Sequence, residues 1–204
     1  MSHPEPTSIL THGAGRLPRR RLDRIARDDA RRPAVESFIA GIYRERYEAS
    51  VEHWAPTLVA LRTDDRLVAA AGYRRADTPL YVEHYLDASV EQAIAALTGH
   101  RVERRQVVEV GHFASAQPGE GRRLLLLLAR HLAGTGCRWV VSTATRELRE
   151  LLIRVGLTPF ALAPADPSRL PGGASGWGRY YDHAPVVVAG DLARGLAALE
   201  RKRG

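Results

Sequence analysis

Apolar side chains recur along the first half of the chain at a helical spacing and then at the spacing of strands. From Pro33 to Tyr47 they fall three and four residues apart, which places them on one face of a helix. The runs 58–61 and 67–73 are apolar and are joined by a short polar turn, so they predict an antiparallel hairpin. A short extended segment is expected over 80–86, before a helix that a capping pattern starts near Ser89.

The second half of the chain alternates strand patterns with helix patterns. The expected elements are a strand over 107–110, a helix through 124–128, a strand over 138–143, a helix over 145–155, strands over 157–163 and 185–189, and a helix from Asp191. This alternation predicts an α/β fold, with a mixed β-sheet flanked by helices on both faces. The organisation we expect is a basic N-terminal arm over residues 1–32, one domain over 33–190 and a C-terminal helix over 191–204.

Composition narrows the class of protein. The chain has 204 residues, 45% of them hydrophobic, and a formal net charge of +7. Such a chain can bury a core, and its charge favours anionic partners: nucleotide phosphates, an acidic carrier protein, nucleic acid or a membrane surface. A generally basic, solvated surface would give the same charge.

The cysteine content and the hydropathy of the chain indicate the cellular compartment in which we expect the protein. The single cysteine, Cys137, excludes an internal disulfide, and the first residues lack the basic and apolar pattern of a secretory leader, so we expect a cytoplasmic protein. The longest strongly apolar run, Leu124–Ala129, is too short for a membrane-spanning helix.

A glycine-bearing turn, Gln117 to Arg122, joins an apolar strand to a helix. Its glycines let backbone amides point into a cavity at a helix N-terminus, a place that attracts phosphate. The turn resembles the Q/R-x-x-G-x-G/A loop that holds the pyrophosphate of the acyl donor in the GNAT acyltransferase fold. The resemblance implies acyl-CoA or an acyl carrier protein (ACP) thioester as co-substrate, no metal, and donor contacts from Phe113, Ser115, Gln117, Gly119, Gly121 and Arg122.

Other segments narrow the resemblance. Ala71–Leu80 resembles the segment of acyl-homoserine-lactone synthases in which a glycine-containing strand leads to an arginine and a Thr-x-Pro turn. Val108–Phe113 resembles their E-x-S-R-F strand, with Gly111 and His112 in place of the serine and the arginine. Five segments together resemble the thermostable hemolysin family: Ala70–Arg74, Val82–Asp87, Val108–His112, Ser142–Thr145 and Trp177–Tyr181. The family label implies lysis, whereas the fold implies acyl transfer.

Acyl transfer to an amine needs a base, because the amine is protonated at neutral pH. Glu109 interrupts an apolar strand, so desolvation would raise the pKa of its carboxylate and suit it to this role. Glu83, which lies among aromatic residues, is the second candidate base. Each could instead pair with one of the many arginines. Tyr181 or Tyr180 is expected either to protonate the leaving thiolate or to pack as an aromatic. The residues expected to contact the acceptor are Arg74, His84, His112, Trp177 and Tyr180.

Other interpretations stay open. His112 could be a base, a substrate contact or a polar core residue, and with Glu83 and His84 it could form a cluster whose spacing requires no metal. A peripheral, membrane-active hemolysin-like protein without enzymatic activity would need an exposed apolar patch. A nucleic-acid binder would need a binding motif that we do not find. We predict an N-acyltransferase for a small-molecule amine or hydroxyl acceptor, with an acidic ACP and a second copy of the chain as candidate partners.

Overall fold

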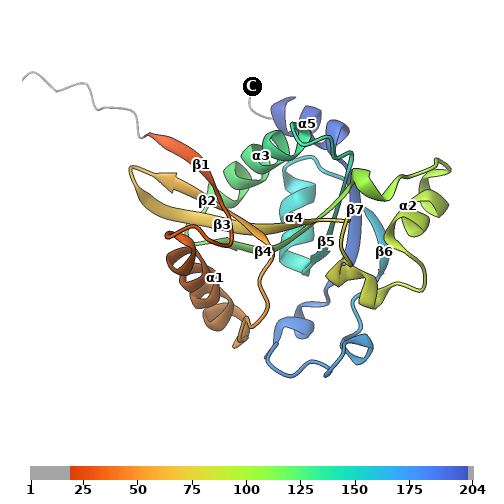
Figure 1. The fold of residues 1–204 in the computed structure, drawn as a ribbon, viewed down its shortest axis with the longest axis horizontal. Helices are drawn as coiled ribbons and strands as arrows, with labels where there is room; N and C mark the ends of the chain where they lie inside the picture. Colours follow the sequence, from red (N-terminus) through yellow and green to blue (C-terminus); the bar gives the residue numbers. More distant parts are fainter. Residues whose placement is uncertain (1–18, 202–204) are drawn as a thin grey trace, which may run out of the picture.

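The computed structural model describes residues 19–201, in which seven strands form one sheet in the order β1-β2-β3-β4-β5-β7-β6 (Figure 1). The strands are β1 (Arg20–Ile25), β2 (Thr57–Thr63), β3 (Arg66–Arg75), β4 (Val107–Ser115), β5 (Trp139–Ala144), β6 (Phe160–Pro164) and β7 (Val186–Asp191). Neighbouring strands run antiparallel except β4 and β5, which are parallel. The expected mixed sheet is confirmed.

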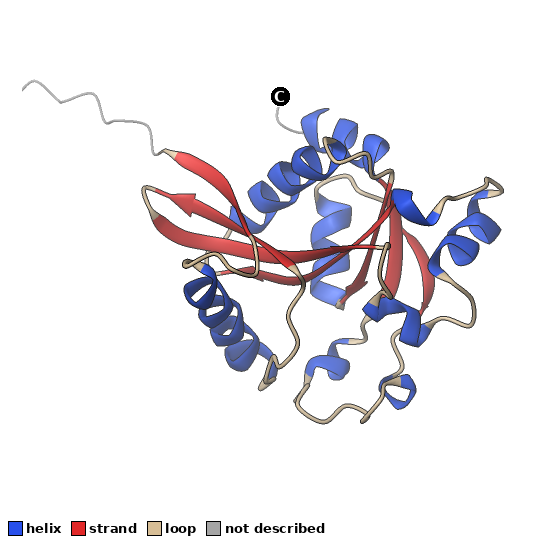
Figure 2. Ribbon diagram, in the orientation of Figure 1, coloured by secondary structure: helices blue, strands red, loops and turns tan. Residues whose placement is uncertain are grey.

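Helices cover both faces of this sheet, as predicted (Figure 2). One face carries α1 (Arg32–Tyr47) and α2 (Val90–Thr98), and the other carries α3 (Glu120–Ala133), α4 (Arg146–Arg154) and α5 (Leu192–Arg201). Side chains alternate between the two faces along each strand. In β4, Val108 therefore packs in the cluster that contains α3, whereas Val107 packs in the cluster that contains α2.

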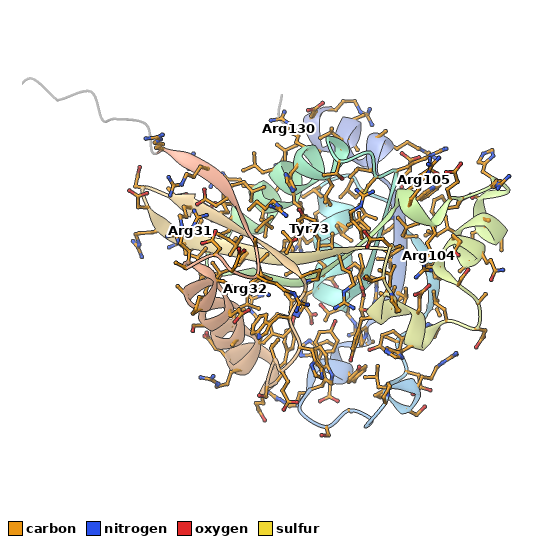
Figure 3. The ribbon with its side chains drawn as sticks, viewed as in Figure 1. Arg31, Arg32, Tyr73, Arg104, Arg105 and Arg130 are labelled. Atoms are coloured by element: carbon orange, nitrogen blue, oxygen red, sulfur yellow. The ribbon has the colours of Figure 1, made fainter. Side chains whose placement is uncertain are left out.

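Helix α1 forms where the periodic pattern predicts it. Its buried apolar residues are three or four positions apart and lie on one face: Val35, Ile39 and Tyr43. The buried Arg32 side chain fixes the start of the helix to the segment before β2 (Figure 3). Its guanidinium donates to the carbonyl oxygens of Ala55 and Pro56 and to Glu36.

Residues 20–25, expected within a basic arm, form β1 and pair with β2 at the edge of the sheet. Ile25 of this strand is fully buried, and Asp23 forms ion pairs with Arg21 and Arg62. A buried apolar residue and an acid that offsets the arginines make a strand favourable here, so the expectation of an arm is wrong for these residues. Residues 1–18 of that arm lie outside the described residues.

The segment 80–86, expected to be extended, contains the 3-10 helix η1 (Tyr81–Tyr85). Two carboxylates stabilise its start, since Glu109 accepts the N–H groups of Tyr81 and Val82 and Glu83 accepts that of Leu80. They satisfy amides that have no acceptor within the helix. Because Glu109 is remote in the sequence, the local pattern does not predict this turn.

Candidate active site

The candidate site lies where β4 and β5 separate. The two strands pair only over Val107–Glu109 and Trp139–Val141, although β4 continues to Ser115 and β5 to Ala144. Beyond Glu109, the edge of β4 that faces β5 therefore has no strand partner. Its backbone N–H and C=O groups border an opening in the sheet and can form hydrogen bonds to a ligand.

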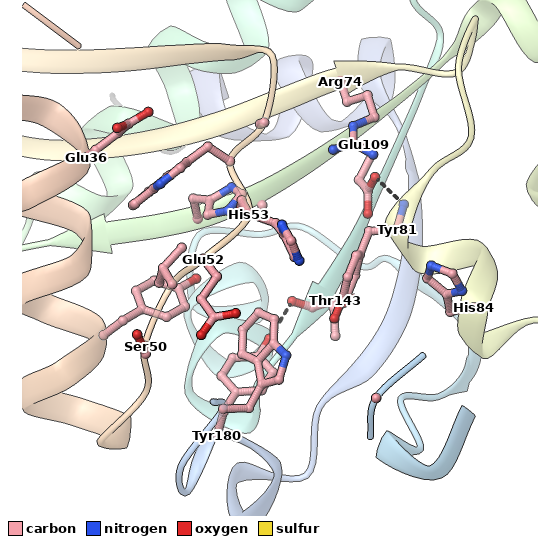
Figure 4. A pocket seen from close by; sticks show the side chains of 18 of the residues that line it. Glu36, Ser50, Glu52, His53, Arg74, Tyr81, His84, Glu109, Thr143 and Tyr180 are labelled. Carbon is pink, nitrogen blue, oxygen red and sulfur yellow. Dashed lines mark hydrogen bonds between the residues drawn. The ribbon is translucent and has the colours of Figure 1, made fainter. Parts of the chain in front are cut away.

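A cavity of about 970 Å³ lies on the α1 side of this opening (Figure 4). It touches both separating strands, β4 from Glu109 to His112 and β5 at Thr143. Its other walls include α1, the segment 50–55, η1 and parts of the segment 171–180. The residues predicted to contact the acceptor all line it: Arg74, His84, His112, Trp177 and Tyr180. A cavity of this size can hold a small-molecule ligand.

The cavity has an aromatic wall that sequence reasoning found only in part. Trp177 and Tyr180 were expected there, but they are joined by Tyr43, Trp54, Tyr81 and Tyr85. These rings come from separate segments of the chain, so no local spacing indicates that they meet. Tyr180 donates its hydroxyl to the carbonyl oxygen of Thr143 at 3.2 Å, which connects this wall to β5. Such a wall suits an apolar chain or ring.

Glu109 is buried in the cavity wall at the point where the strands part. Its Oε2 accepts the N–H of Tyr81 at 2.8 Å and its Oε1 accepts that of Val82 at 2.9 Å. Burial raises the pKa of Glu109, and the two amide donors oppose that rise. Each carboxylate oxygen has a second lone pair, so Glu109 can accept a proton while it holds η1.

Glu83 and Tyr181, the other predicted catalytic residues, are not among the residues that line the cavity. The Arg104 guanidinium lies 2.6 Å from Glu83, and together with backbone amides it lowers the pKa of Glu83 to about 2. A carboxylate with so low a pKa is a weak base. The Tyr181 hydroxyl shares a 2.7 Å hydrogen bond with that of Tyr85, and burial raises the pKa of Tyr181 to about 12. This geometry favours structural roles for both.

His112 lines the cavity but directs its ring nitrogens to other groups. Nε2 lies 2.9 Å from the carbonyl oxygen of His53, and because a carbonyl only accepts, Nε2 carries the proton. Nδ1 is buried with no hydrogen-bond partner among residues 19–201, and burial lowers the pKa of the ring. The residue has a φ of 54° in a β-bulge of β4, and its ring stacks on Trp54. Of its expected roles, this geometry favours that of a polar residue of the wall.

The predicted donor contacts lie together where β4 ends and α3 begins. Gly119 is the N-cap of α3, with a φ of 84° that favours glycine, and the first-turn amides of a helix have no intrahelical acceptor. Gly121 packs under the Phe113 ring, which would lie 3.5 Å from an added Cβ. The Ser115 hydroxyl donates to the carbonyl oxygen of Gln117 at 3.1 Å. Arg122 follows in the first turn of α3, where a helix N-terminus favours a phosphate. The buried carboxylate of Glu120 in the same turn opposes an anion and is offset in part by its ion pair with Arg123.

Within residues 19–201, no group of three or more His, Cys, Asp or Glu side chains is arranged to hold a metal ion. No helix in the same range is both long and apolar enough to cross a membrane. The exposed large apolar side chains there lie on three different elements, α2, α4 and β6: Leu97, Ile153 and Phe160.

The sequence matches the family model described as Thermostable hemolysin over residues 25–196. The chain belongs to the thermostable hemolysin family. Among curated proteins, none matches the sequence of this family member.

Solved structures share the fold of this thermostable hemolysin family member at low sequence identity. FeeM, an N-acyl amino acid synthase from uncultured soil microbes, is similar with a TM-score of 0.62 and 14% identity, over 92% of this chain and 98% of that one. The AHL synthase LasI gives a TM-score of 0.58 and 14% identity, over 86% and 91% of the two chains. The structure of BjaI, a CoA-dependent acyl-homoserine lactone synthase, with SAM and isopentyl-CoA gives a TM-score of 0.59 and 14% identity, over 90% of this chain and 89% of that one. The expected α/β fold, a mixed sheet flanked by helices on both faces, is confirmed and is shared with these synthases.

Proposed function

We propose that this protein is an N-acyltransferase that moves an acyl group from a CoA or carrier-protein thioester to the amine of a small molecule. The observation that carries the proposal is the position of Glu109, a buried carboxylate in the wall of a cavity at the opening between β4 and β5. Structural neighbours support a thioester donor, since one is described as CoA-dependent and another as an N-acyl amino acid synthase.

The donor has a continuous path to this cavity. Its phosphates would bind at the Gly119 end of α3, where helix amides are free of intrahelical acceptors. From there the unpaired edge of β4 leads back from Ser115 to Glu109. A pantetheine arm can hydrogen-bond to such an edge as an added strand would. The thioester would then reach the wall in which Glu109 lies.

The chemistry requires one proton acceptor and one group that stabilises negative charge. Glu109, directly or through a water molecule, takes a proton from the acceptor's ammonium group and so frees the nitrogen lone pair. The nitrogen attacks the thioester carbonyl, a C–N bond forms, and the C–S bond breaks as the thiolate leaves. Backbone N–H groups on the unpaired edge of β4 can stabilise the oxyanion that forms between these two events.

Replacing Glu109 by Gln is expected to lower the transfer rate about 10²- to 10⁴-fold, the usual contribution of a general base. Thiol release from a panel of acyl-CoA and acyl-ACP thioesters, with product mass, measures the rate with amine and alcohol acceptors. Because burial raises the pKa of Glu109, the wild-type rate should rise with pH above the ordinary range of Glu, and the variant should lack this rise. Hydroxylamine, largely unprotonated at neutral pH, should restore most of the lost rate.

Glu52→Gln is the matched control, because Glu52 lines the same cavity as an exposed carboxylate. It should leave the rate and its pH dependence unchanged. Equal losses in the two variants would reject Glu109 as the base. Lysis of liposomes by a wild-type preparation that releases no thiol from any thioester would favour the membrane-active alternative instead.

A further inference from the structure

Arg74 brings a guanidinium with unused hydrogen-bond donors to the wall of the cavity. It lies on β3 directly opposite Glu109 of β4, and the two side chains are next to each other in Figure 4. Within the described residues its guanidinium makes one hydrogen bond, from Nη1 to the carbonyl oxygen of Pro79 at 3.2 Å, and no ion pair. A guanidinium has five N–H donors, so most of those of Arg74 are left for a ligand.

Neighbouring arginines are engaged in a way that Arg74 is not. Arg32 also lines the cavity, but its guanidinium is bonded to Glu36 and to the carbonyl oxygens of Ala55 and Pro56. Arg75, the next residue of β3, donates to the carbonyl oxygens of Thr135 and Arg105. Arg74 faces the Glu109 carboxylate, and its charge lowers the pKa of that group, but it forms no direct ion pair within the described residues. An anionic ligand would give its free N–H donors a direct partner.

The cation and the carboxylate are spaced as in a cross-strand pair. Side chains directly opposite each other on neighbouring antiparallel strands have Cβ atoms about 4.5–5.5 Å apart. An α-amino acid carries an ammonium group and a carboxylate on one carbon, so it can face both side chains at once. Its carboxylate would take the two parallel N–H donors that a guanidinium offers, and its amine would lie toward Glu109. Tyr81, Tyr85 and Trp177 leave an aromatic wall for its side chain.

We infer that the acceptor is an apolar or aromatic α-amino acid, whose carboxylate Arg74 binds and whose amine it directs to Glu109. This inference rests on the proposed acyl transfer. The ammonium group loses one proton to Glu109, the nitrogen attacks the thioester carbonyl, and the C–S bond breaks. The second nitrogen proton leaves as the amide forms and the thiolate becomes a thiol. The products are an N-acyl amino acid, the free thiol and one proton.

The test compares each amino acid with the amine that lacks its carboxylate, phenylalanine with phenethylamine and leucine with 3-methylbutylamine. The wild-type protein should prefer the amino acid in kcat/KM by about 10- to 100-fold, the worth of a hydrogen bond between charged groups. Arg74→Gln should abolish this preference, because it lowers the amino-acid value through the lost carboxylate contact, whereas any effect of the lost charge on Glu109 is shared by both acceptors. Arg27→Gln is the control, because Arg27 is an exposed cation that lines the same cavity. It should keep the preference.

The outcomes separate this inference from the proposed function. Acyl transfer at equal rates to amino acids and their amines would overturn the inference and keep the function. Loss of the preference in Arg27→Gln but not in Arg74→Gln would also overturn it. Calorimetry of the N-acyl amino acid and of the matching N-acyl amine gives a second readout. The N-acyl amino acid could bind more tightly than the N-acyl amine to the wild type but not to Arg74→Gln, while the wild type transfers no acyl group. In that case the assignment of the ligand stands and the proposed function fails.

Discussion

The two glutamates of the site region show how surroundings decide what a side chain can do. Glu109 is buried, which raises its pKa, and the two amides that it accepts only partly oppose this rise. Glu83 faces the Arg104 guanidinium at 2.6 Å, which stabilises the charged form and removes its basicity. In the sequence, both residues lie among apolar or aromatic neighbours. Their different roles follow only from their partners in the folded protein, Arg104 for Glu83 and backbone amides for Glu109.

Replacing Glu83 by Gln should lower the free energy of unfolding by about 2 kcal/mol at pH 7, less than the full pKa shift implies because solvent screens this partly exposed pair. The pKa of Glu83 is about 2 in the folded protein, below its value of about 4.3 in an unfolded chain. Its stabilisation is therefore complete above the unfolded value and is lost as the pH falls toward 2. Urea unfolding at a series of pH values should show the wild type and the variant converging in acid.

Glu91→Gln is the control for that experiment. Glu91 contacts the same guanidinium at 3.0 Å, but Glu83 also accepts backbone amides of Leu80 and Val90. The Glu91 variant should lose less than about 1 kcal/mol, as for a partly exposed ion pair. Both variants should transfer acyl groups at the wild-type rate while folded. A transfer rate that falls in the folded Glu83 variant would return this residue to the catalytic set.

At the scale of elements, the turn proposed to bind the donor, Gln117 to Arg122, depends on one glycine with a positive φ, Gly119. Gly119→Ala should cost about 1 kcal/mol of stability, because a Cβ disfavours its positive φ, and should raise the KM for the thioester donor. Gly136 is a matched control beyond the other end of α3, with a φ of 77° against 84° for Gly119 and nothing near an added Cβ in either. Gly136→Ala should destabilise equally by thermal unfolding and leave the donor KM unchanged. Equal rises in KM would show a general effect of stability.

Most elements could be predicted from the sequence, because the local pattern of apolar residues alone indicates whether the segment forms a helix or a strand. Between β4 and α4, the apolar periodicities are long enough to distinguish the strands from the helices. The exceptions, β1 and η1, depend on remote groups. Arg20–Ile25 becomes a strand by pairing with β2, and Tyr81–Tyr85 turns because Glu109 captures its first amides. Neither interaction leaves a local signal.

At the scale of the whole molecule, the cavity arises where distant loops meet. The N–H of Ser50 donates to the carbonyl oxygen of Gly176 at 2.6 Å, and the N–H of Arg179 donates to that of Tyr47 at the same distance. These bonds bring the segment 171–180 against the end of α1 and close the aromatic wall. The sequence could therefore predict Glu109, Arg74 and the donor loop as candidates, but could not predict the cavity that joins them.

Two exposed arginines, Arg20 and Arg66, lie beside the acidic turn Asp64–Asp65 at the hairpin end of the sheet. Arg20 of β1 lies opposite Thr63, which pairs with Arg66, and Ala69 pairs with Ser115 just before the donor loop. Arg66 and Ala69 are three residues apart on β3, so Arg66 lies within about 10 Å, along the strand, of the position that pairs with Ser115. If an acidic carrier protein presents the thioester, exposed arginines there should attract it, and the attraction should weaken with salt.

Arg20→Gln and Arg66→Gln should therefore each raise the KM for an acyl-ACP donor about threefold at low ionic strength, and less at 0.15 M salt and above, as expected for charges at the rim of an interface. The KM for acyl-CoA should change little, since CoA lacks the extended acidic surface of a carrier protein. Arg105→Gln is the control, because Arg105 is exposed at the opposite end of β4 (Figure 3). If the KM for acyl-ACP does not depend on salt, or if Arg105→Gln raises it equally, these arginines belong to a generally basic, solvated surface. CoA would then be the preferred carrier of the acyl group.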